Sequence, residues 1–497
     1  MDGSALAQYK MYIGGEWVES ASGQHFASDN PYTGQPWAQI PRGNAADADR
    51  AVQAARKAYT SGEWPKLNAS RRGALLRKLG DLIGEKSKFL AEIEVRDNGK
   101  LYAEMSAQTA YMAQWYYYYG GLADKIEGHV IPIDKPDTFN YTRYEPLGVV
   151  AAIIPWNSPL LLLAWKLAPA LAAGNTMVIK PSEYTSASTL EFMKLIEAAG
   201  IPPGVVNVVT GYGAEIGSPL VEHPLVAKIA FTGSDATGQK IYESAARGLK
   251  RVSMELGGKS PNIVFDDAHI DNAVKGVVSG IFAATGQTCI AGSRLLVQQS
   301  IHDQFVEKLV ALGKTAKIGN PMNLDTQVGP VTNPPQFEKI LKYIDIAKGE
   351  GAKPVLGGAR ATRPECGTGW FVEPTVFTGV KNSMRIAQEE VFGPVLSVIP
   401  FRDEEEAIAI GNDVVFGLAA GVWTQDMRRA LVMADRLQAG TVWVNTYRAV
   451  SYLSPFGGYK RSGIGRESGQ EMIMEYMQTK SVWISTATDV PNPFVIR

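Results

Sequence analysis

The stretch LGVVAAIIP, residues 147–155, decides the fold class of this chain. It is a continuous apolar run rich in β-branched residues, which is typical of a strand buried on both faces of a sheet. Further strand-like runs follow at NTMVIKP (175–181), VVNVVTG (205–211) and KIAFTG (228–233), with helical patterns at 185–199 and 237–247 between them. Alternating strands and helices predict βαβ units and a parallel sheet.

A second alternating region follows Leu256. The strand-like segments PNIVFDD (261–267) and SRLLVQ (293–298) precede helical patterns at 271–285 and 301–316. Upstream, short strands and turns are expected over 11–40, and helices over 47–58 and 70–119. The chain is therefore expected to contain two α/β regions in series.

A polar hairpin is expected just before the deciding stretch. HVIPI (129–133) and FNYTRY (139–144) have the texture of strands, and the turn signal Lys135-Pro136-Asp137 lies between them. A hairpin this polar does not suit the centre of a core. An arm that reaches another subunit is one explanation.

Composition excludes several classes of protein. The 497 residues carry a net charge of −1, so no global basic field exists to hold nucleic acid or an anionic membrane. The most apolar stretch, Leu160–Gly174, contains Lys166 and Pro169 and is too short to span a bilayer. Two cysteines exclude a disulfide scaffold, and no signal peptide is visible, so a cytoplasmic protein with reduced thiols is expected.

Cys289 is the first candidate for chemistry. It lies in ATGQTCIAGSR (284–294), between glycines and small polar residues, and this composition fits a nucleophile and a structural cysteine about equally well. A nucleophile needs a base, and no histidine lies in a motif that marks one. Glu255 in VSMELGGKSP could serve, although a Glu before Gly-Gly is usually a turn or cap residue.

Three further segments allow two interpretations each. The amide of Asn157, in IIPWNSP, could donate to an oxyanion or stabilise a turn. Lys180 and Glu183, in KPSE, could hold ribose hydroxyls or form a surface ion pair. In FTGSDATGQ (231–239), a helix starting near Ser234 could bind a pyrophosphate or be an ordinary capped helix.

Seven blocks in order carry a family resemblance: PWNSP, KPSE, FTGS, ELGGKSP, GQTC, EEVFGP and SPFGGYKRSGIGRE. Together they resemble the NAD(P)-dependent aldehyde dehydrogenase superfamily, from about Tyr12 to Ser485. The resemblance implies an α/β fold with a Rossmann-type cofactor domain, an α/β catalytic domain and a small β oligomerisation arm. The expected boundaries are 1–127 and 147–256 for the NAD-binding domain, 257–470 for the catalytic domain, and 128–146 and 471–497 for the arm.

The resemblance also implies a reaction and the residues that perform it. Cys289 would attack an aldehyde to form a thiohemiacetal, and loss of hydride to the cofactor would leave a thioester. Asn157 and the Cys289 backbone N–H would form the oxyanion hole, and Glu255 would activate water for hydrolysis. Lys166 and Glu467 would carry protons away from Glu255. A cysteine-dependent esterase or acyl-transferase on the same scaffold is the alternative.

The cofactor expected from the resemblance is NAD rather than NADP. Lys180 and Glu183 would hold the adenosine ribose, and an acidic group there would repel a 2′-phosphate. Ser234 would contact the pyrophosphate and Glu390 the nicotinamide ribose. Asp235 replaces the threonine of many relatives, and it could weaken cofactor affinity or point to solvent. The remaining expected cofactor contacts are Pro155, Trp156, Gly211, Thr232, Gly233 and Phe392.

The substrate pocket is expected to be wider or more polar than in enzymes for small aliphatic aldehydes. Ser158 stands where many relatives have a bulky aromatic residue. Arg448 could bind an acidic substrate tail, as in a semialdehyde, or pair with a backbone carbonyl. The other expected pocket residues are Trp165, Thr288, Val450 and Phe456. No metal site is expected, and family members with such an N-terminal segment suggest a homotetramer.

Overall fold

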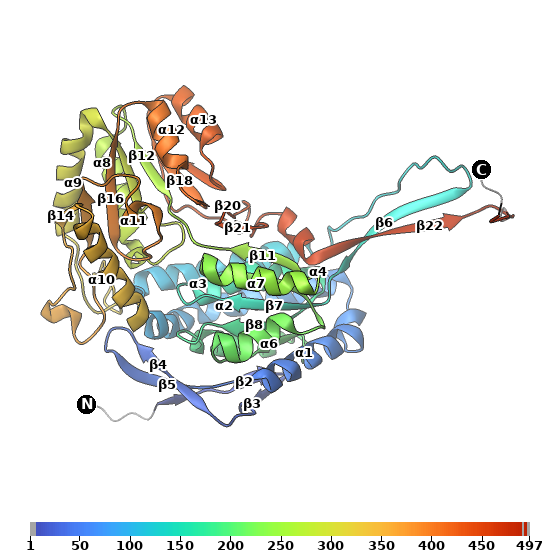
Figure 1. Ribbon diagram of the computed structural model, residues 1–497. Helices are drawn as coiled ribbons and strands as arrows, with labels where there is room; N and C mark the ends of the chain where they lie inside the picture. Colours follow the sequence, from blue (N-terminus) through green and yellow to red (C-terminus); the bar gives the residue numbers. More distant parts are fainter. Residues whose placement is uncertain (1–5, 490–491, 495–497) are drawn as a thin grey trace.

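The computed structural model describes residues 6–489 and 492–494 and contains two large sheets (Figure 1). The first has eight strands in the order β21-β11-β10-β7-β8-β9-β2-β3. The deciding stretch forms its central strand β7, which pairs in parallel with β8 and β10. Its strands are β2 (Met11–Ile13), β3 (Glu16–Val18), β7 (Val149–Ile154), β8 (Thr176–Pro181), β9 (Val206–Val208), β10 (Val226–Thr232), β11 (Arg251–Glu255) and β21 (Gly463–Ile464).

Helices from the first half of the chain surround this sheet (Figure 1). They are α1 (Ala45–Thr60), α2 (Ala69–Asn98), α3 (Tyr102–Leu122), α4 (Pro159–Ala173), α5 (Ala187–Ala199), α6 (Ser218–Glu222) and α7 (Asp235–Arg247). Every residue of α4 is buried. The most apolar stretch of the sequence is therefore a core helix that packs against the first sheet. A smaller sheet from the N-terminal region contains β1 (Ala7–Gln8), β4 (His25–Asn30) and β5 (Gln35–Pro41).

The second large sheet has seven strands in the order β14-β15-β16-β13-β12-β18-β19. Its strands are β12 (Pro261–Val264), β13 (Arg294–Gln298), β14 (Lys353–Leu356), β15 (Thr375–Thr378), β16 (Val395–Phe401), β18 (Ala419–Trp423) and β19 (Thr441–Val444). Its helices are α8 (Ile270–Phe282), α9 (His302–Lys314), α10 (Pro334–Gly349), α11 (Arg385–Gln388), α12 (Glu404–Asn412) and α13 (Met427–Arg436). The expected α/β fold class is confirmed.

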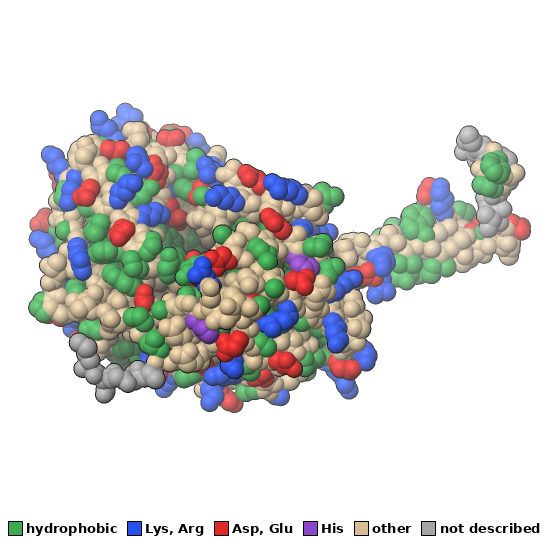
Figure 2. Space-filling view, turned by 60° about the horizontal axis from the view of Figure 1, so that its bottom comes forward, with side chains coloured by type: hydrophobic (Ala, Val, Ile, Leu, Met, Phe, Trp, Pro, Cys, Tyr) green, Lys and Arg blue, Asp and Glu red, His purple; other side chains and the backbone are tan. Residues whose placement is uncertain are grey.

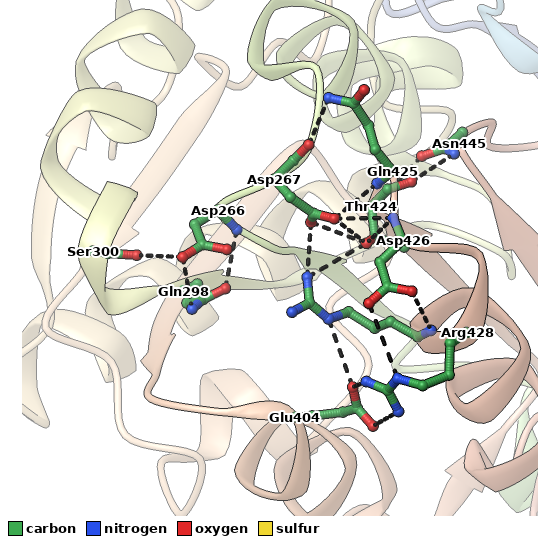
Figure 3. Close-up of polar contacts among 11 residues, drawn as sticks. Asp266, Asp267, Gln298, Ser300, Glu404, Thr424, Gln425, Asp426, Arg428 and Asn445 are labelled. Carbon is green, nitrogen blue, oxygen red and sulfur yellow. Dashed lines mark hydrogen bonds and ion pairs between the residues drawn. The ribbon is translucent and has the colours of Figure 1, made fainter.

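A polar network fixes one end of the second sheet (Figure 3). Asp267, just after β12, accepts hydrogen bonds from the Thr424 hydroxyl and from the backbone N–H groups of Gln425 and Asp426. Arg429 on α13 donates to the same carboxylate at 2.8 Å. These bonds hold the pKa of Asp267 below its usual range, although its partial burial acts the other way. The network ties α13 to the loop after β12.

The C-terminal part of the chain pairs with earlier strands in two places. A short ribbon of β17 (Phe416–Gly417) and β20 (Tyr459–Lys460) leads to β21, which pairs with β11. Beyond the 3₁₀ segment Glu471–Tyr476, β22 (Met477–Ser485) pairs antiparallel with β6 (Thr138–Pro146). These two strands form an arm that projects from the body (Figure 1).

The sequence-based hairpin over 129–144 is wrong in part. Residues 139–144 do lie in a strand, but 129–133 form only an isolated bridge, between Val130 and Tyr141. The true partner of β6 is β22, from the other end of the chain. Pro132 lacks a backbone N–H, which disfavours a regular ladder in the first segment.

Candidate functional site

Cys289 lies in a loop with a constrained backbone between α8 and β13. Ala284, Thr285 and Gly286 precede it with φ values of 53°, 54° and 66°, in the left-handed region. A Cβ on Gly286 would lie 2.0 Å from the carbonyl oxygen of Gly393, so only glycine fits there. Strained non-glycine residues of this kind cluster at functional sites.

The thiol of Cys289 is held in its neutral form. Burial and the nearby carboxylates of Glu255 and Glu390 raise its pKa to about 12, although Lys100 acts in the opposite direction. The resting site therefore contains a protonated thiol, and a base is required to make it nucleophilic.

Glu255 ends β11 and is brought against Cys289 by the two glycines that follow it. A Cβ on Gly257 would lie 2.6 Å from Glu390 Oε2, and one on Gly258 would lie 2.4 Å from the Cys289 carbonyl oxygen. The Gly258 N–H donates to Glu390 Oε1 at 2.9 Å. The Gly-Gly pair therefore allows three chain segments to meet at one point.

The carboxyl of Glu255 is suited to accept a proton. It is 3% exposed, and its Oε2 has no hydrogen-bond partner among the described residues. Burial and the neighbouring Glu467 carboxylate raise the pKa of Glu255 well above its ordinary value, with Lys166 and Arg466 opposing the shift. A carboxylate with a raised pKa is a stronger base.

Lys166 and Glu467 form a buried ion pair next to Glu255. Their side chains are fully buried, and Lys166 Nζ lies 2.6 Å from Glu467 Oε1. The same ammonium donates to Thr232 Oγ1 at 2.7 Å. Thr232 and Glu255 are paired neighbours in β10 and β11, so the ion pair lies beside the strand end that carries Glu255.

Asn157 comes from the loop between β7 and α4. It is 7% exposed, and its Nδ2 donates to the carbonyl oxygen of Gln287, two residues before Cys289, at 3.1 Å. This bond fixes the amide near the thiol. It uses only one of the two N–H groups of the Asn157 amide. The position suits a donor to an oxygen on a carbon bonded to Cys289.

One cavity of about 120 Å³ is lined by Cys289, Glu255 and Asn157 together with most of the expected cofactor contacts. Sequence-based candidates in its lining are Pro155, Trp156, Asn157, Thr232, Gly233, Ser234, Glu255, Cys289, Glu390 and Phe392. Lys180, Glu183 and Gly211 are not part of this lining and lie farther along the first sheet. Gln336 and Lys339 on α10 also line it and were missed, because nothing in their local sequence marks them.

Contacts between the loop after β7 and the segment before β16 hold the cavity wall in place. The Phe392 ring packs edge-on to Trp156, with centroids 5.2 Å apart. Phe392 has a φ of 59°, and Gln336 Nε2 donates to its carbonyl at 3.0 Å. A Cβ on Gly233 would lie 2.5 Å from the Phe231 ring, so any other residue at this turn would displace that ring.

The helix start in the cavity is a capped one. Ser234 is the N-cap of α7 and accepts a hydrogen bond from the Thr237 N–H at 3.3 Å. Asp235 forms an ion pair with Arg461 at 2.8 Å. The aspartate that departs from the family pattern is therefore engaged with a positive partner.

Lys180 and Glu183 form a pair at the carboxyl end of β8. Lys180 Nζ donates to the Pro181 carbonyl at 3.1 Å and lies 3.5 Å from Glu183 Oε2. Glu183 keeps 28% of its side chain exposed, so it can accept a hydrogen bond from a ligand. Gly211 has a φ of 140°, and a Cβ there would lie 2.9 Å from the Gly43 carbonyl oxygen.

The six residues expected in the substrate pocket do not line this cavity. Trp165 and Phe456 are buried, with ring centroids 5.1 Å apart. Thr288 and Val450 are half-buried. Ser158 is 6% exposed, and its Oγ accepts a hydrogen bond from Lys100 Nζ at 2.8 Å.

Two further observations bear on the substrate side. Arg448 donates to the carbonyl oxygen of Ser279 at 3.4 Å, which is the backbone pairing stated as the alternative for this residue. Lys100 was missed by the sequence analysis, because a lysine after a helix end is usually a surface residue. Burial lowers the pKa of Lys100 to about 8.

No group of three or more His, Cys, Asp or Glu side chains within the described residues could hold a metal ion. In the same residues, no helix is long and apolar enough to cross a membrane.

Comparisons with known proteins show the family of this chain. The model of the aldehyde dehydrogenase family matches residues 17–482. A "(Z)-2-((N-methylformamido)methylene)-5-hydroxybutyrolactone dehydrogenase" of Acinetobacter baylyi is 47% identical over 99% of this chain and 100% of its own length. A betaine aldehyde dehydrogenase of Bacillus subtilis is 44% identical over 97% of this chain and 99% of its own. The crystal structure of betaine aldehyde dehydrogenase from Staphylococcus aureus in complex with NAD⁺ is 43% identical, with a TM-score of 0.96 over 98% of this chain and 97% of that one.

Proposed function

The chain belongs to the aldehyde dehydrogenase family. We propose that it oxidises an aldehyde to a carboxylic acid in this cavity, with NAD as the hydride acceptor. One observation carries the proposal. Cys289, Glu255 and Asn157, which come from three distant segments, line the same cavity of about 120 Å³. A nucleophile, a base and an oxyanion donor are the groups that the reaction requires.

The residues around the cavity fit a nicotinamide dinucleotide. The glycines at 233, 257 and 258 let the segments around the cavity pack so closely that a Cβ would collide with Phe231, Glu390 or the Cys289 carbonyl. Ser234 would hold the pyrophosphate, Glu390 the nicotinamide ribose, and Lys180 and Glu183 the adenosine ribose. NAD supplies the hydride acceptor when bound. Glu183 would repel a 2′-phosphate, which favours NAD over NADP.

The first half of the mechanism makes and stabilises a thiohemiacetal. Glu255 takes the proton of the Cys289 thiol, which burial otherwise keeps in place. The sulfur then attacks the carbonyl carbon, and the oxygen becomes negative. Asn157 Nδ2 and the Cys289 N–H donate to this oxygen. When the negative oxygen collapses, hydride leaves the carbon and a thioester remains on Cys289.

The second half hydrolyses the thioester. Glu255 must first lose the proton that it took from the thiol, and the Lys166–Glu467 pair, both side chains fully buried, would receive it. Glu255 then takes a proton from water, and the resulting hydroxide attacks the thioester carbonyl. The C–S bond breaks, the Cys289 sulfur recovers this second proton from Glu255, and the carboxylic acid leaves.

The substrate is proposed to be larger or more polar than acetaldehyde. The small Ser158 and its contact with the Lys100 ammonium support this proposal. The pairing of Arg448 with a backbone carbonyl gives a semialdehyde no specific support.

The assembly is proposed to be a homotetramer of a cytoplasmic protein. The arm carries exposed apolar side chains, among them Phe139, Trp483 and Ile484, and it projects away from the body (Figure 2). Exposed apolar strands are typical of a surface that pairs with another chain. The cofactor domain would consist of residues 1–127 and 147–256, the catalytic domain of 257–470, and the arm of 128–146 and 471–497.

The test is NADH formation with a panel of aliphatic, aromatic and acid-tailed aldehydes, with NADP⁺ in parallel. NAD⁺-dependent oxidation that disappears in Cys289→Ala is the expected result. Ester hydrolysis without any aldehyde oxidation would instead favour a cysteine-dependent esterase or acyl-transferase.

A further inference from the structure

A row of buried polar atoms without protein partners starts at Glu255 and leads away from the cavity. Such atoms are normally hydrogen-bonded, often by ordered water. In the part of the chain that the structure describes, the atoms of this row with no partner are Glu255 Oε2, Glu467 Oε2, Ser253 Oγ, Lys228 Nζ and Tyr476 OH.

The register of β10 and β11 places this row on one face of the first sheet. The paired residues are Lys228↔Arg251, Ala230↔Ser253 and Thr232↔Glu255. Side chains two positions apart on a strand share a face, so Lys228 points to the same side as Thr232, and Ser253 to the same side as Glu255. Thr232 accepts from Lys166, which shows that α4 covers this face.

The outer end of the row reaches the surface at Glu475. Lys228 Nζ lies 3.5 Å from Glu475 Oε2, and the Glu475 side chain is 41% exposed. Gly465 lies between Ser253 and Glu475, since a Cβ on this glycine would be 3.3 Å from the Ser253 Cβ and 3.7 Å from Glu475 Oε2. Ser253, Lys228 and Glu475 are therefore neighbours, and Glu467 lies near enough to act on the charge of Lys228.

The proposed reaction needs such a row. Each turnover places two protons on Glu255, one from the thiol and one from water, and only one returns to the Cys289 sulfur, so the other must leave a carboxyl that is 3% exposed. The Lys166–Glu467 pair next to it is fully buried and cannot release a proton to solvent by itself. A route that ends at an exposed group is required.

We propose that Lys228 and Glu475 complete the proton exit from Glu255, through Glu467 and Lys166 and then along the Ser253–Lys228 row to the surface. This proposal rests on the proposed function. The groups that face Lys228 are Glu475 and the Tyr476 ring, 5.1 Å away, from the 3₁₀ segment, Arg251 from β11, and Glu467.

The charge state of Lys228 supports this role. Burial lowers its pKa to about 8, with Glu475 and Glu467 opposing the shift and Arg251 adding to it. A lysine with this pKa exchanges a proton readily near neutral pH. Lys228 acts through Glu255 and does not touch the substrate, so it is a positioning residue for proton transfer.

The test separates oxidation from hydrolysis in Lys228→Met and Glu475→Gln. With the aldehyde found best for the wild-type protein, rapid-mixing kinetics should show a first turnover of NADH at the wild-type rate. A slow phase should follow, reduced by about tenfold and deepest at low pH, because deacylation waits for Glu255 to lose its proton. Imidazole in the buffer should partly restore the slow phase, and Lys228→Arg should not, because a guanidinium does not give up its proton near neutral pH. Lys194→Met on α5, whose partner is Glu191, is the matched control.

Two results would overturn the proposal. One is wild-type kinetics in both variants, with the slow phase within about twofold. The other is an equal loss of the first turnover and the slow phase, which indicates a structural role. Glu475→Gln alters an exposed side chain and keeps the test valid if Lys228→Met fails to fold. Absence of NADH from the wild-type protein with every aldehyde would instead contradict the proposed function.

Discussion

Replacing Asn157 by alanine tests the oxyanion donor directly. The Asn157 amide is almost fully buried and is held at 3.1 Å from the Gln287 carbonyl, so it is oriented before any substrate binds. Removing one pre-oriented donor to an oxyanion typically costs about 3–4 kcal/mol, or roughly 10²–10³ in kcat. The lost hydrogen bond to Gln287 should cost only about 1 kcal/mol of folding stability.

The assay measures kcat for NADH formation at saturating aldehyde, with KM and the rate of Cys289 alkylation by iodoacetamide. Because the amide is not proposed to bind the neutral aldehyde, KM should change little, and the thiol should react at the wild-type rate. Asn157→Asp, which keeps the size but removes the donors, should behave like the alanine variant. A fall in kcat of less than about fivefold would refute the assignment, as would a parallel loss of alkylation, which indicates a displaced loop.

Three further changes have expected outcomes. Glu255→Gln should abolish turnover. As the pH rises above about 4.5, the wild type should lose stability relative to this variant, because a carboxyl whose pKa is raised in the folded state ionises at lower pH in the unfolded chain. Denaturant titration at several pH values measures the difference in free energy of unfolding, and a difference that is constant with pH would contradict the prediction. Lys166→Met should lose about 3–5 kcal/mol, because Glu467 is left buried and unpaired, and adding Glu467→Gln should recover much of the loss; an additive double variant would rule out the coupling. Trp483→Ser on the exposed arm should weaken subunit association in sedimentation without altering the far-ultraviolet spectrum; an unchanged mass would contradict the arm's role.

The central sheet could be predicted from sequence because its signal is local. Residues 147–155 are apolar throughout and form β7, and the following strand-like runs form its neighbours β8, β9 and β10. The arm could not be predicted in the same way. β6 pairs with β22, which lies more than 300 residues later, and no local pattern specifies such a partner. The expected strand at 129–133 failed for a local reason, because Pro132 has no backbone N–H to give to a regular ladder.

The site was predicted through the family blocks rather than from single residues. By composition, Cys289 and Asn157 were each consistent with a structural role, and Glu255 resembled a turn residue. Only the structure shows why the glycines at 257 and 258 follow Glu255: side chains there would collide with Glu390 and the Cys289 carbonyl. Lys100 and Lys228 were missed, because a buried lysine in a sequence has no signature until its surroundings are known.

The chemistry of this site follows from how its charges are buried. Burial and the nearby Glu467 carboxylate raise the pKa of Glu255 and make it a stronger base. The Glu255 carboxylate in turn helps to keep the Cys289 thiol neutral. The resting enzyme therefore protects its nucleophile with a buried base beside it, at a cost in stability that the positive charges of Lys166 and Arg466 limit. The same burial that strengthens the base also traps the proton it accepts. A site built in this way needs a proton route as much as it needs a nucleophile, and the β10–β11 face is where the sequence provides the polar groups for one.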